Sequence, residues 1–443
     1  MKLIGRNKDK TAIDNYRKLI SRAYEMPLML LIMVFQAACM GLMAFKDGEI
    51  NRFCVVMAFA LPLGTWGLTY VINKLIYADK ALILLTAFLA SLGVITLRAV
   101  LISPAKAISQ AEVLPLGCAF MLLGALLIHF LRIRGWLVWL LMVFCAALMV
   151  MPFAFTTASS AKSWIRLWGR QLQPSEFVKP ALVVILAYGF TRGSRINDWF
   201  VYAFYAAGLC VILLLQKDLG AVLLYFLLTA AMFSVGTGRW KLALAALVLA
   251  AAVGAVFVSF ADRIPGFSYL AARIDIWRDP WNSQREESRQ IVQGLMSISS
   301  GGLFGAGLGL SAARKVAVVA SDYIFAAVCE EFGIVFAFSV ICVYAIMLIR
   351  GCGVAMSARG RFYALAAFGS VFELTSQMLL IVMGNLHILP LTGVTLPFVS
   401  EGGSSLCGSM LLIGLVLGVS AMNAKDEYDD LKSLEMRGGR LKL

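Results

Sequence analysis

The chain has 443 residues, of which 61% are hydrophobic and only 14% are charged. Soluble domains carry about 25% charged residues, so this composition excludes an ordinary soluble domain and predicts a polytopic membrane protein. The net charge of +14 does not indicate a nucleic-acid partner, because basic residues gather at the cytoplasmic face of membrane proteins, beside anionic membrane lipid.

Residues 1–25 are basic and precede the first apolar run, and so long a charged stretch is not typical of a cleaved signal peptide. Twelve apolar segments of bilayer-spanning length follow. We predict membrane helices at 26–45, 53–75, 81–102, 112–131, 135–156, 176–192, 197–216, 219–237, 239–261, 322–349, 361–384 and 402–422. The predicted fold is an all-α polytopic membrane helix bundle.

Lys and Arg residues lie between alternate predicted helices, and the tail at 423–443 carries five more. Because basic residues mark cytoplasmic segments, both termini are predicted to be cytoplasmic. The segments 157–175, 262–321 and 385–401 are then predicted to lie on the outer side. No separate soluble domain is expected.

The nine cysteines lie in or beside apolar segments, without a CxxC pair, and His129 and His387 are far apart in the sequence. Neither a disulfide framework nor a zinc site is expected from this distribution. We predict that the cysteines pack as small apolar side chains.

The first outer segment ends in a short polar motif, Gln173-Pro-Ser-Glu176, with Lys179 one turn further on. Residues three apart share a helix face, so Glu176 and Lys179 are predicted to be neighbours. An acid in the first turn also stabilises a helix N-terminus, which is the structural alternative. At a membrane edge, however, charge is expensive and is usually paired or functional.

The segment 262–321 is the long polar stretch between predicted membrane helices. A loop of about 60 residues is too long for a simple connection and is a functional candidate. It carries Arg273, Gln290, Gln293 and a glycine run from Gly301 to Gly309. Glycine-rich backbone can offer N–H groups to a pyrophosphate, or it can form a re-entrant turn that needs small residues. The sequence leaves both readings open.

Asp322 stands where this long segment re-enters the membrane, and Glu330 and Glu331 follow in the predicted helix 322–349. Charged residues within the bilayer cost about 2.5–3.5 kcal/mol on insertion scales, so this helix is predicted to be buried in the bundle. Asp322 would then lie at the mouth of a membrane cleft. The structural alternative is a helix cap.

The last outer segment, 385–401, contains two prolines and several glycines and serines in an otherwise apolar run. Irregular backbone at membrane depth is tolerated only where it is buried in protein or lines a cavity. His387 in this segment is more often a hydrogen-bonded structural residue than a ligand.

Together these segments resemble the SEDS family (shape, elongation, division and sporulation), whose members include FtsW, RodA and SpoVE. The resemblance covers about residues 160–422. It is carried by Gln173-Pro-Ser-Glu176 with Lys179-Pro180, Gln216-Lys-Asp218-Leu-Gly220, Arg273 through Pro280, Gln290 with Gln293, Ser300 through Gly309, Asp322-Tyr-Ile-Phe325, Glu330 through Gly333, and Gly393 through Ser405.

The resemblance implies a peptidoglycan glycosyltransferase that polymerises lipid II at the outer face of a bacterial cytoplasmic membrane, in division, elongation or sporulation. The family's aspartate falls on Asp322, which can act as a general base. Supporting or substrate-binding roles are expected for Glu176, Lys179, Arg273, Gln290, Gln293, Glu330 and Ser404. A divalent cation, Mg or Mn, and a transpeptidase partner of the class B penicillin-binding type are also implied.

The chain departs from the family pattern at several positions, which indicates a divergent member. Ala320-Ser321 stands where His-Thr is usual, Lys217 replaces a proline and Glu401 replaces a tyrosine. The family core has ten helices, so the segment 26–75 looks like an addition to a core at 81–422. A lipid II flippase and a non-catalytic scaffold for a cell-wall synthase are the alternatives to the enzyme.

Overall fold

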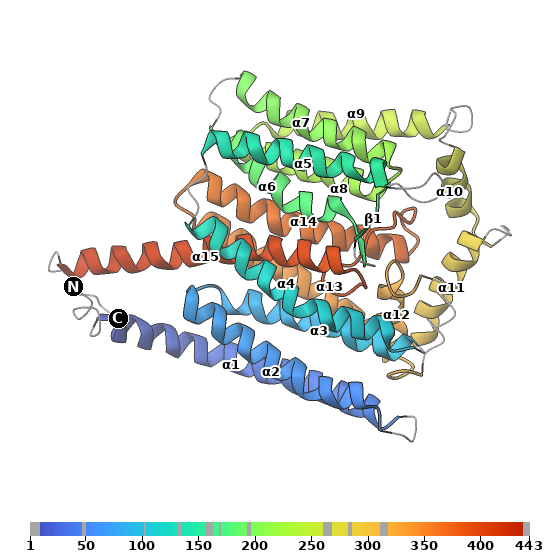
Figure 1. Ribbon diagram of the computed structural model, residues 1–443, viewed down its shortest axis with the longest axis horizontal. Coiled ribbons are helices and arrows are strands. Elements are labelled where there is room, and N and C mark those ends of the chain that lie inside the picture. The colour runs from blue at the N-terminus through green and yellow to red at the C-terminus, as the bar shows by residue number, and fades with distance from the viewer. Residues whose placement is uncertain are drawn as a thin grey trace.

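The computed structural model describes residues 9–46, 50–101, 103–130, 134–155, 163–167, 170–192, 196–259, 268–281, 286–310 and 318–436 (Figure 1). Within these ranges the chain forms α1 (Asp9–Ala44), α2 (Arg52–Leu75), α3 (Lys80–Val100), α4 (Ala105–Phe130), α5 (Gly135–Phe155), β1 (Ile165–Leu167), β2 (Arg170–Leu172), α6 (Pro174–Arg192), α7 (Ile196–Leu215), α8 (Leu219–Thr237), α9 (Trp240–Ser259), α10 (Ser268–Arg278), α11 (Glu286–Gly301), α12 (Ile324–Phe332), α13 (Ile334–Met356), α14 (Arg361–Asn385) and α15 (Gly403–Met436).

The all-α membrane bundle is confirmed. Nine of the described helices are long and apolar enough to cross a membrane, namely α1 to α5, α8, α13, α14 and α15. The helices α6, α7 and α9 coincide with the remaining predicted spans and are 19, 20 and 20 residues long. No disulfide joins the nine cysteines, all of which lie within the described ranges.

The prediction of one helix over 322–349 is wrong. The structure divides this segment into α12 and α13, which meet at Gly333, where φ is +87°. The glycine run reaches this break, and a side chain on Gly333 would collide with the carbonyl oxygen of Leu303. With nine residues, α12 is too short to span a bilayer; Glu330 lies in this short helix, and Asp322 directly precedes its N-cap, Tyr323.

Two helices and a pair of short strands inside the predicted outer loops were not anticipated. The described part of 262–321 contains α10 and α11, which lie across one end of the bundle (Figure 1). The segment 157–175 contains the antiparallel pair β1–β2, in register Ile165 to Leu172. We call this end of the molecule the loop end; it also carries residues 386–402, the last loop, between α14 and α15.

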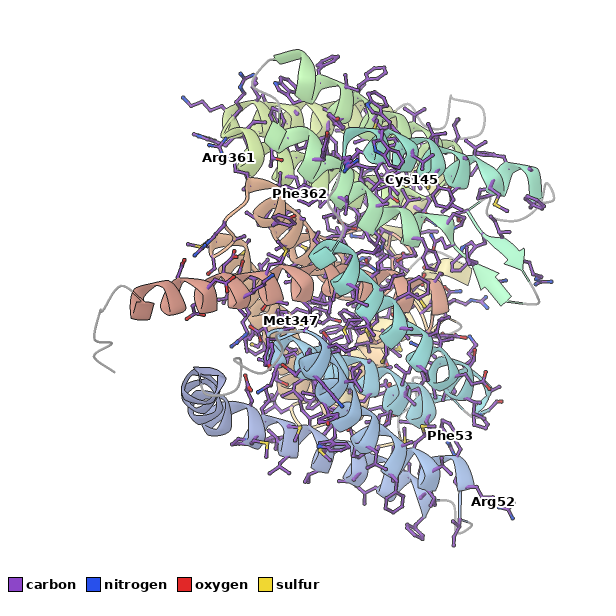
Figure 2. All side chains as sticks on the ribbon, turned by 60° about the vertical axis from the view of Figure 1, so that its left-hand side comes forward. Arg52, Phe53, Cys145, Met347, Arg361 and Phe362 are labelled. Atoms are coloured by element: carbon purple, nitrogen blue, oxygen red, sulfur yellow. The ribbon has the colours of Figure 1, made fainter. Side chains whose placement is uncertain are left out.

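The start of the first helix and the end of the last lie at the same end of the bundle. The start of α1 and the end of α15 both project from the end opposite α10 and α11 (Figure 1). Arg361, at the start of α14, lies toward that same end, whereas Arg52, at the start of α2, lies at the opposite one (Figure 2). The described chain therefore begins and ends on the same side of the bundle.

The helices α3, α14 and α15 lie in the interior of the bundle. In the most apolar 18-residue stretch of these helices, 83%, 78% and 83% of the residues are buried, compared with 28% in α1 and in α2. The axes of α4 and α15 approach closely because both carry glycine at the contact: a Cβ on Gly124 would lie 2.7 Å from the carbonyl oxygen of Leu411. Close backbone approach through small residues is the usual packing of membrane helices.

The α4–α15 contact gives a stability prediction. Replacing Gly414 with alanine should lower the thermal unfolding midpoint in detergent, because the new Cβ would collide with the carbonyl oxygen of Met121. Overpacking of this kind costs about 1–3 kcal/mol. The matched control is Gly208→Ala in α7, where a Cβ meets nothing within 4 Å. An equal midpoint for both variants would contradict this packing.

Candidate active site

A buried ammonium group joins two helices near the loop end. The Nζ of Lys179, on α6, lies 2.8 Å from Oε2 of Glu176 and donates to Oε1 of Gln377, on α14, at 2.7 Å. Lys179 is 2% exposed and Glu176 6% exposed. The predicted neighbourhood of Glu176 and Lys179 is therefore found, and a buried charge of this kind must be paired to be tolerated.

Glu373 is the third charged group of this region. It lies one helical turn before Gln377 on α14, is fully buried, and neither carboxylate oxygen has a hydrogen-bond partner. The charges of Lys179 and Glu176 both act on it. We call Glu176, Lys179, Glu373 and Gln377 the lysine cluster. Sequence reasoning missed Glu373 and Gln377, although an acid inside the apolar segment 361–384 is the signal that marks such positions.

The start of α6 is fixed by side chains from two other helices. The backbone N–H of Gln173 donates to Oγ of Ser404, at 3.4 Å, and its side chain donates to Oδ2 of Asp218, at 2.8 Å. Asp218 in turn caps α8 by accepting from the N–H of Ala221. Burial raises the pKa of the Asp218 carboxyl, and the nearby charge of Glu176 adds to that rise.

The last loop connects the lysine cluster to the region of Asp322. The amide of Gln377 donates to the carbonyl oxygen of Thr395 at 2.9 Å, and the Thr395 hydroxyl lies 2.7 Å from that of Ser405. Two residues earlier in the loop, a Cβ on Gly393 would lie 3.8 Å from Oδ2 of Asp322. The irregular backbone expected from the sequence thus lies in the site itself.

The backbone around Asp322 is held by side chains from the neighbouring elements. Asn385, the last residue of α14, donates to the carbonyl oxygen of Asp322 at 2.7 Å and accepts from the N–H of Ala326 at 3.1 Å. Ser400, in the last loop, donates to the carbonyl oxygen of Ser321 at 2.7 Å. These bonds fix the direction in which the Asp322 carboxylate leaves the backbone.

The Asp322 carboxyl is half-buried, and it does not act as a helix cap. The N-cap of α12 is Tyr323, and no side chain caps that helix end. Burial raises the pKa of the Asp322 carboxyl, while a hydrogen bond from Ser321 and the charge of Arg273 act in the opposite direction. Arg273 lies on α10, which is also tied to the last loop, since the indole of Trp277 donates to the carbonyl oxygen of His387 at 3.2 Å.

The other predicted site residues, Gln290, Gln293 and Glu330, lie on α11 and α12. Gln290 and Gln293 are half-buried on α11, beside Gly294, which packs against the ring of Tyr323. Glu330 lies at the other end of α12 and accepts a hydrogen bond from Ser297 of α11. Glu330 therefore holds α11 against α12 and does not line the region around Asp322.

The glycine run is a re-entrant turn, one of the two readings that the sequence left open. The N–H of Ala306 donates to the carbonyl oxygen of Glu330 at 2.7 Å, and that of Gly307 to Glu331 at 3.2 Å. Gly309 donates to the Glu331 carboxylate. These N–H groups are engaged within the protein and do not form a pyrophosphate cradle.

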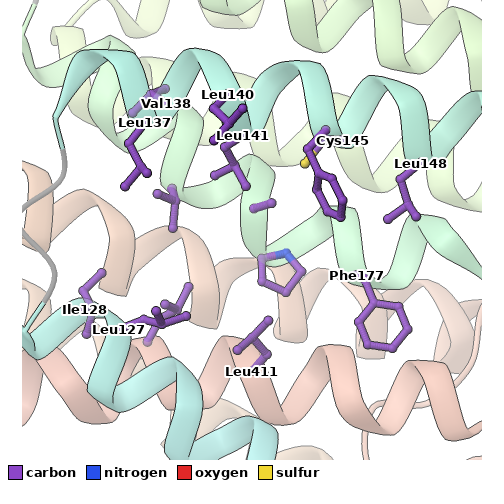
Figure 3. Close-up of a pocket in the computed structure, with 15 residues that line it drawn as sticks. Leu127, Ile128, Leu137, Val138, Leu140, Leu141, Cys145, Leu148, Phe177 and Leu411 are labelled. Carbon is purple, nitrogen blue, oxygen red and sulfur yellow. The ribbon is translucent and has the colours of Figure 1, made fainter.

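An apolar groove adjoins the lysine cluster. It has a volume of about 550 Å³ and is lined by side chains of α4, α5, α6 and α15. Phe177 and Leu148 lie at one end, and Leu127 and Leu137 at the other (Figure 3). Since Phe177 directly follows Glu176, the groove approaches the charged groups at the loop end.

The buried ion pair allows a test that does not depend on activity. Lys179→Met leaves Glu176 buried and unpaired, which should destabilise the protein by about 3–5 kcal/mol. Adding Glu176→Leu removes the uncompensated charge, so the double variant should regain most of the thermal stability. A double variant no more stable than Lys179→Met would show that the two residues are not energetically coupled.

Comparison with known proteins places this geometry in a family. The family model described as cell cycle protein, for FtsW, RodA and SpoVE, matches residues 73–425. A probable peptidoglycan glycosyltransferase FtsW of Caulobacter vibrioides is 32% identical over 62% of this chain and 68% of its own. The peptidoglycan glycosyltransferase RodA of Mycobacterium tuberculosis is 31% identical over 63% of this chain, which spans 62% of that relative.

Solved structures agree with the sequence matches. A chain from a peptidoglycan synthase complex that coordinates polymerisation and crosslinking has a TM-score of 0.63 and 25% identity, covering 79% of this chain and 99% of its own. The rod shape determining protein RodA of Thermus thermophilus has a TM-score of 0.55 and 26% identity, covering 77% and 96%. By the extent of the family match and by its fold, this multi-pass membrane protein belongs to the FtsW, RodA and SpoVE family.

Proposed function

We propose that this protein is a peptidoglycan glycosyltransferase that polymerises lipid II into glycan strands. The observation that carries the proposal is the placement of Asp322. Its carboxylate is half-buried beside Gly393 of the last loop, its backbone is fixed by Asn385 and Ser400, and it corresponds to the family's aspartate. A positioned carboxylate without a capping role is suited to general-base catalysis.

The reaction requires one bond to form and one to break. The base takes the proton of a sugar hydroxyl, the resulting oxygen attacks an anomeric carbon, and the bond from that carbon to the lipid pyrophosphate breaks. Because pyrophosphate is already a good leaving group, a single carboxylate is sufficient. This differs from glycoside hydrolases, in which two carboxylates share the work.

The departing pyrophosphate is stabilised by cations of the protein. Arg273 is exposed on α10, and its charge acts on Asp322. Lys179 is the buried cation of the lysine cluster, 2.8 Å from Oε2 of Glu176 and 2.7 Å from Oε1 of Gln377. Fixed cations aimed at developing negative charge are among the largest catalytic contributions.

The apolar groove supports a lipid-linked substrate. It combines a volume of about 550 Å³ with a lining of Leu, Val, Phe, Pro, Ala, Ile and Cys side chains. Such a surface suits part of an isoprenoid chain. Its position beside Phe177 would place the pyrophosphate end of that chain toward the lysine cluster.

The divalent cation stays a prediction from the family resemblance. Among the described residues, no group of three or more His, Cys, Asp or Glu side chains is placed to hold a metal ion. Within these ranges the side chains thus form no ready-made metal site.

We also infer that both termini are cytoplasmic and that the loop end faces outward, where lipid-linked sugars are polymerised. The expected partner is a transpeptidase of the class B penicillin-binding type. Its support is the similarity to a chain whose complex coordinates polymerisation and crosslinking.

The base assignment is tested by Asp322→Asn. This variant keeps the size of the side chain but cannot accept the proton, so polymerisation of purified lipid II should fall by about 10²–10⁴-fold. The control is Asp426→Asn, an acid on the far end of α15 that pairs with Arg359. Polymerisation by Asp322→Asn at the rate of the control would remove Asp322 from the chemistry.

A pH profile tests the environment of the base. The carboxylate must be ionised to accept a proton, so kcat/KM should fall as the pH drops through the raised pKa of Asp322. The charge of Arg273 lowers that pKa, so Arg273→Met should move the acid limb to higher pH. Arg278→Met, on the same helix, is the control. An unmoved acid limb in Arg273→Met would contradict the coupling.

A further inference from the structure

Glu373 is a buried acid that the proposed chemistry does not use. It is fully buried in α14, and both of its carboxylate oxygens lack a hydrogen-bond partner. The buried acids Glu330 and Glu331, in contrast, accept from Ser297 and from the N–H of Gly309. Burying an ionised carboxylate without hydrogen bonds is so costly that such groups usually take up a proton.

Two helices place charged or titratable groups against Glu373. From α6 come Glu176 and Lys179, whose charges both act on it. From α8 comes Tyr225, which is fully buried, is electrostatically coupled to Glu373, and donates its hydroxyl to the carbonyl oxygen of Ser175 at 2.8 Å. Tyr225 therefore keeps its proton in an existing bond and is not a partner for the acid.

The other helices packed on α14 contribute no charge to this region in the described residues. On α15, Ser409 is buried and its hydroxyl has no hydrogen-bond partner. On α13, Tyr344 is buried and donates to the carbonyl oxygen of Pro397. The charge state of the region is thus set by Glu176, Lys179 and Glu373, together with Asp218 at the start of α8, whose carboxyl interacts with the charges of Glu176 and Lys179.

The charge balance of the lysine cluster depends on Glu373. Glu176 and Lys179 compensate each other at 2.8 Å. An ionised Glu373 would add a negative charge with no cation of its own. It lies one turn from Gln377, the second acceptor of Lys179, so the same ammonium is the group it would attract.

We propose that the proton on Glu373 controls the position of Lys179 and, through it, the rate of glycan polymerisation. With Glu373 protonated, Lys179 stays between Glu176 and Gln377. When Glu373 loses its proton to solvent, the ammonium is drawn toward the new carboxylate and away from the place where it stabilises pyrophosphate. Glu373 is a positioning residue in this scheme. The effect on rate rests on the proposed function, whereas the protonation of Glu373 does not.

The first measurement needs no activity. Infrared spectra of the purified protein, taken across pH, should show a carboxylic acid C=O band that disappears as the pH rises and is absent from Glu373→Gln. In Lys179→Met the band should persist to higher pH, because the cation that favours ionisation is gone. An identical band in wild type and Glu373→Gln would overturn the proposal. So would a band that disappears at the same pH in wild type and in Lys179→Met.

The second measurement is the pH profile of lipid II polymerisation. The wild type should lose up to about 10²-fold in kcat on the alkaline side as Glu373 ionises, the scale of one lost electrostatic contact to the leaving group, and Glu373→Gln should keep its rate there. Glu112→Gln, which changes an exposed acid of α4, is the control and should follow the wild type. An alkaline limb shared by all three proteins would overturn the coupling to rate. If wild type polymerises nothing at any pH, the proposed function fails, while the infrared result still decides where the proton lies.

Discussion

The contact of one buried ammonium with acceptors on two helices organises this end of the molecule. Lys179 cannot reach water, so its charge is balanced by Glu176 on its own helix and its second donor is met by Gln377 on α14. Gln377 extends this network to the last loop, because its amide donates to the carbonyl oxygen of Thr395. Inside a bilayer a polar group cannot hydrogen-bond to water instead, so breaking any of these bonds would be costly.

The same constraint explains how irregular backbone survives at membrane depth. The last loop is bound by side chains on both sides, through Thr395 toward the lysine cluster and through Ser400 toward Ser321. The glycine run is held differently, because its N–H groups donate to backbone carbonyls at the buried C-terminal end of α12, at Glu330 and Glu331. Both devices are rigid, and rigidity is what a carboxylate acting as a base requires of its surroundings.

The site combines an apolar environment with a charged one. An apolar groove along α6 ends near Glu176, and a half-buried acid stands beside Gly393 at the end of the bundle. A substrate with an apolar tail and a charged, sugar-bearing head matches that division. The closely packed α4–α15 contact gives the groove a firm wall, because Gly124 lets the two backbones approach without intervening side chains.

Much of this protein was determined by its sequence alone. Among the described residues, the apolar runs predicted every long helix except α13, which was merged with α12, because a segment that must span hydrocarbon has few alternatives to a helix. The pairing of Glu176 with Lys179 followed from their spacing, and Asp322 was singled out by its place at a polar–apolar boundary and by the family pattern it matches. These features depend on local spacing, which the sequence displays directly.

Tertiary structure decided what local spacing cannot show. The break at Gly333 depends on the approach of Leu303, and the function of the glycine run depends on which acceptors reach its N–H groups. Glu373 and Gln377 lie nearly 200 residues from Lys179 in the chain, so only the packing of α6 on α14 makes them neighbours. A buried charge is a property of everything around it, and its partners are chosen by the fold and not by the segment that carries it.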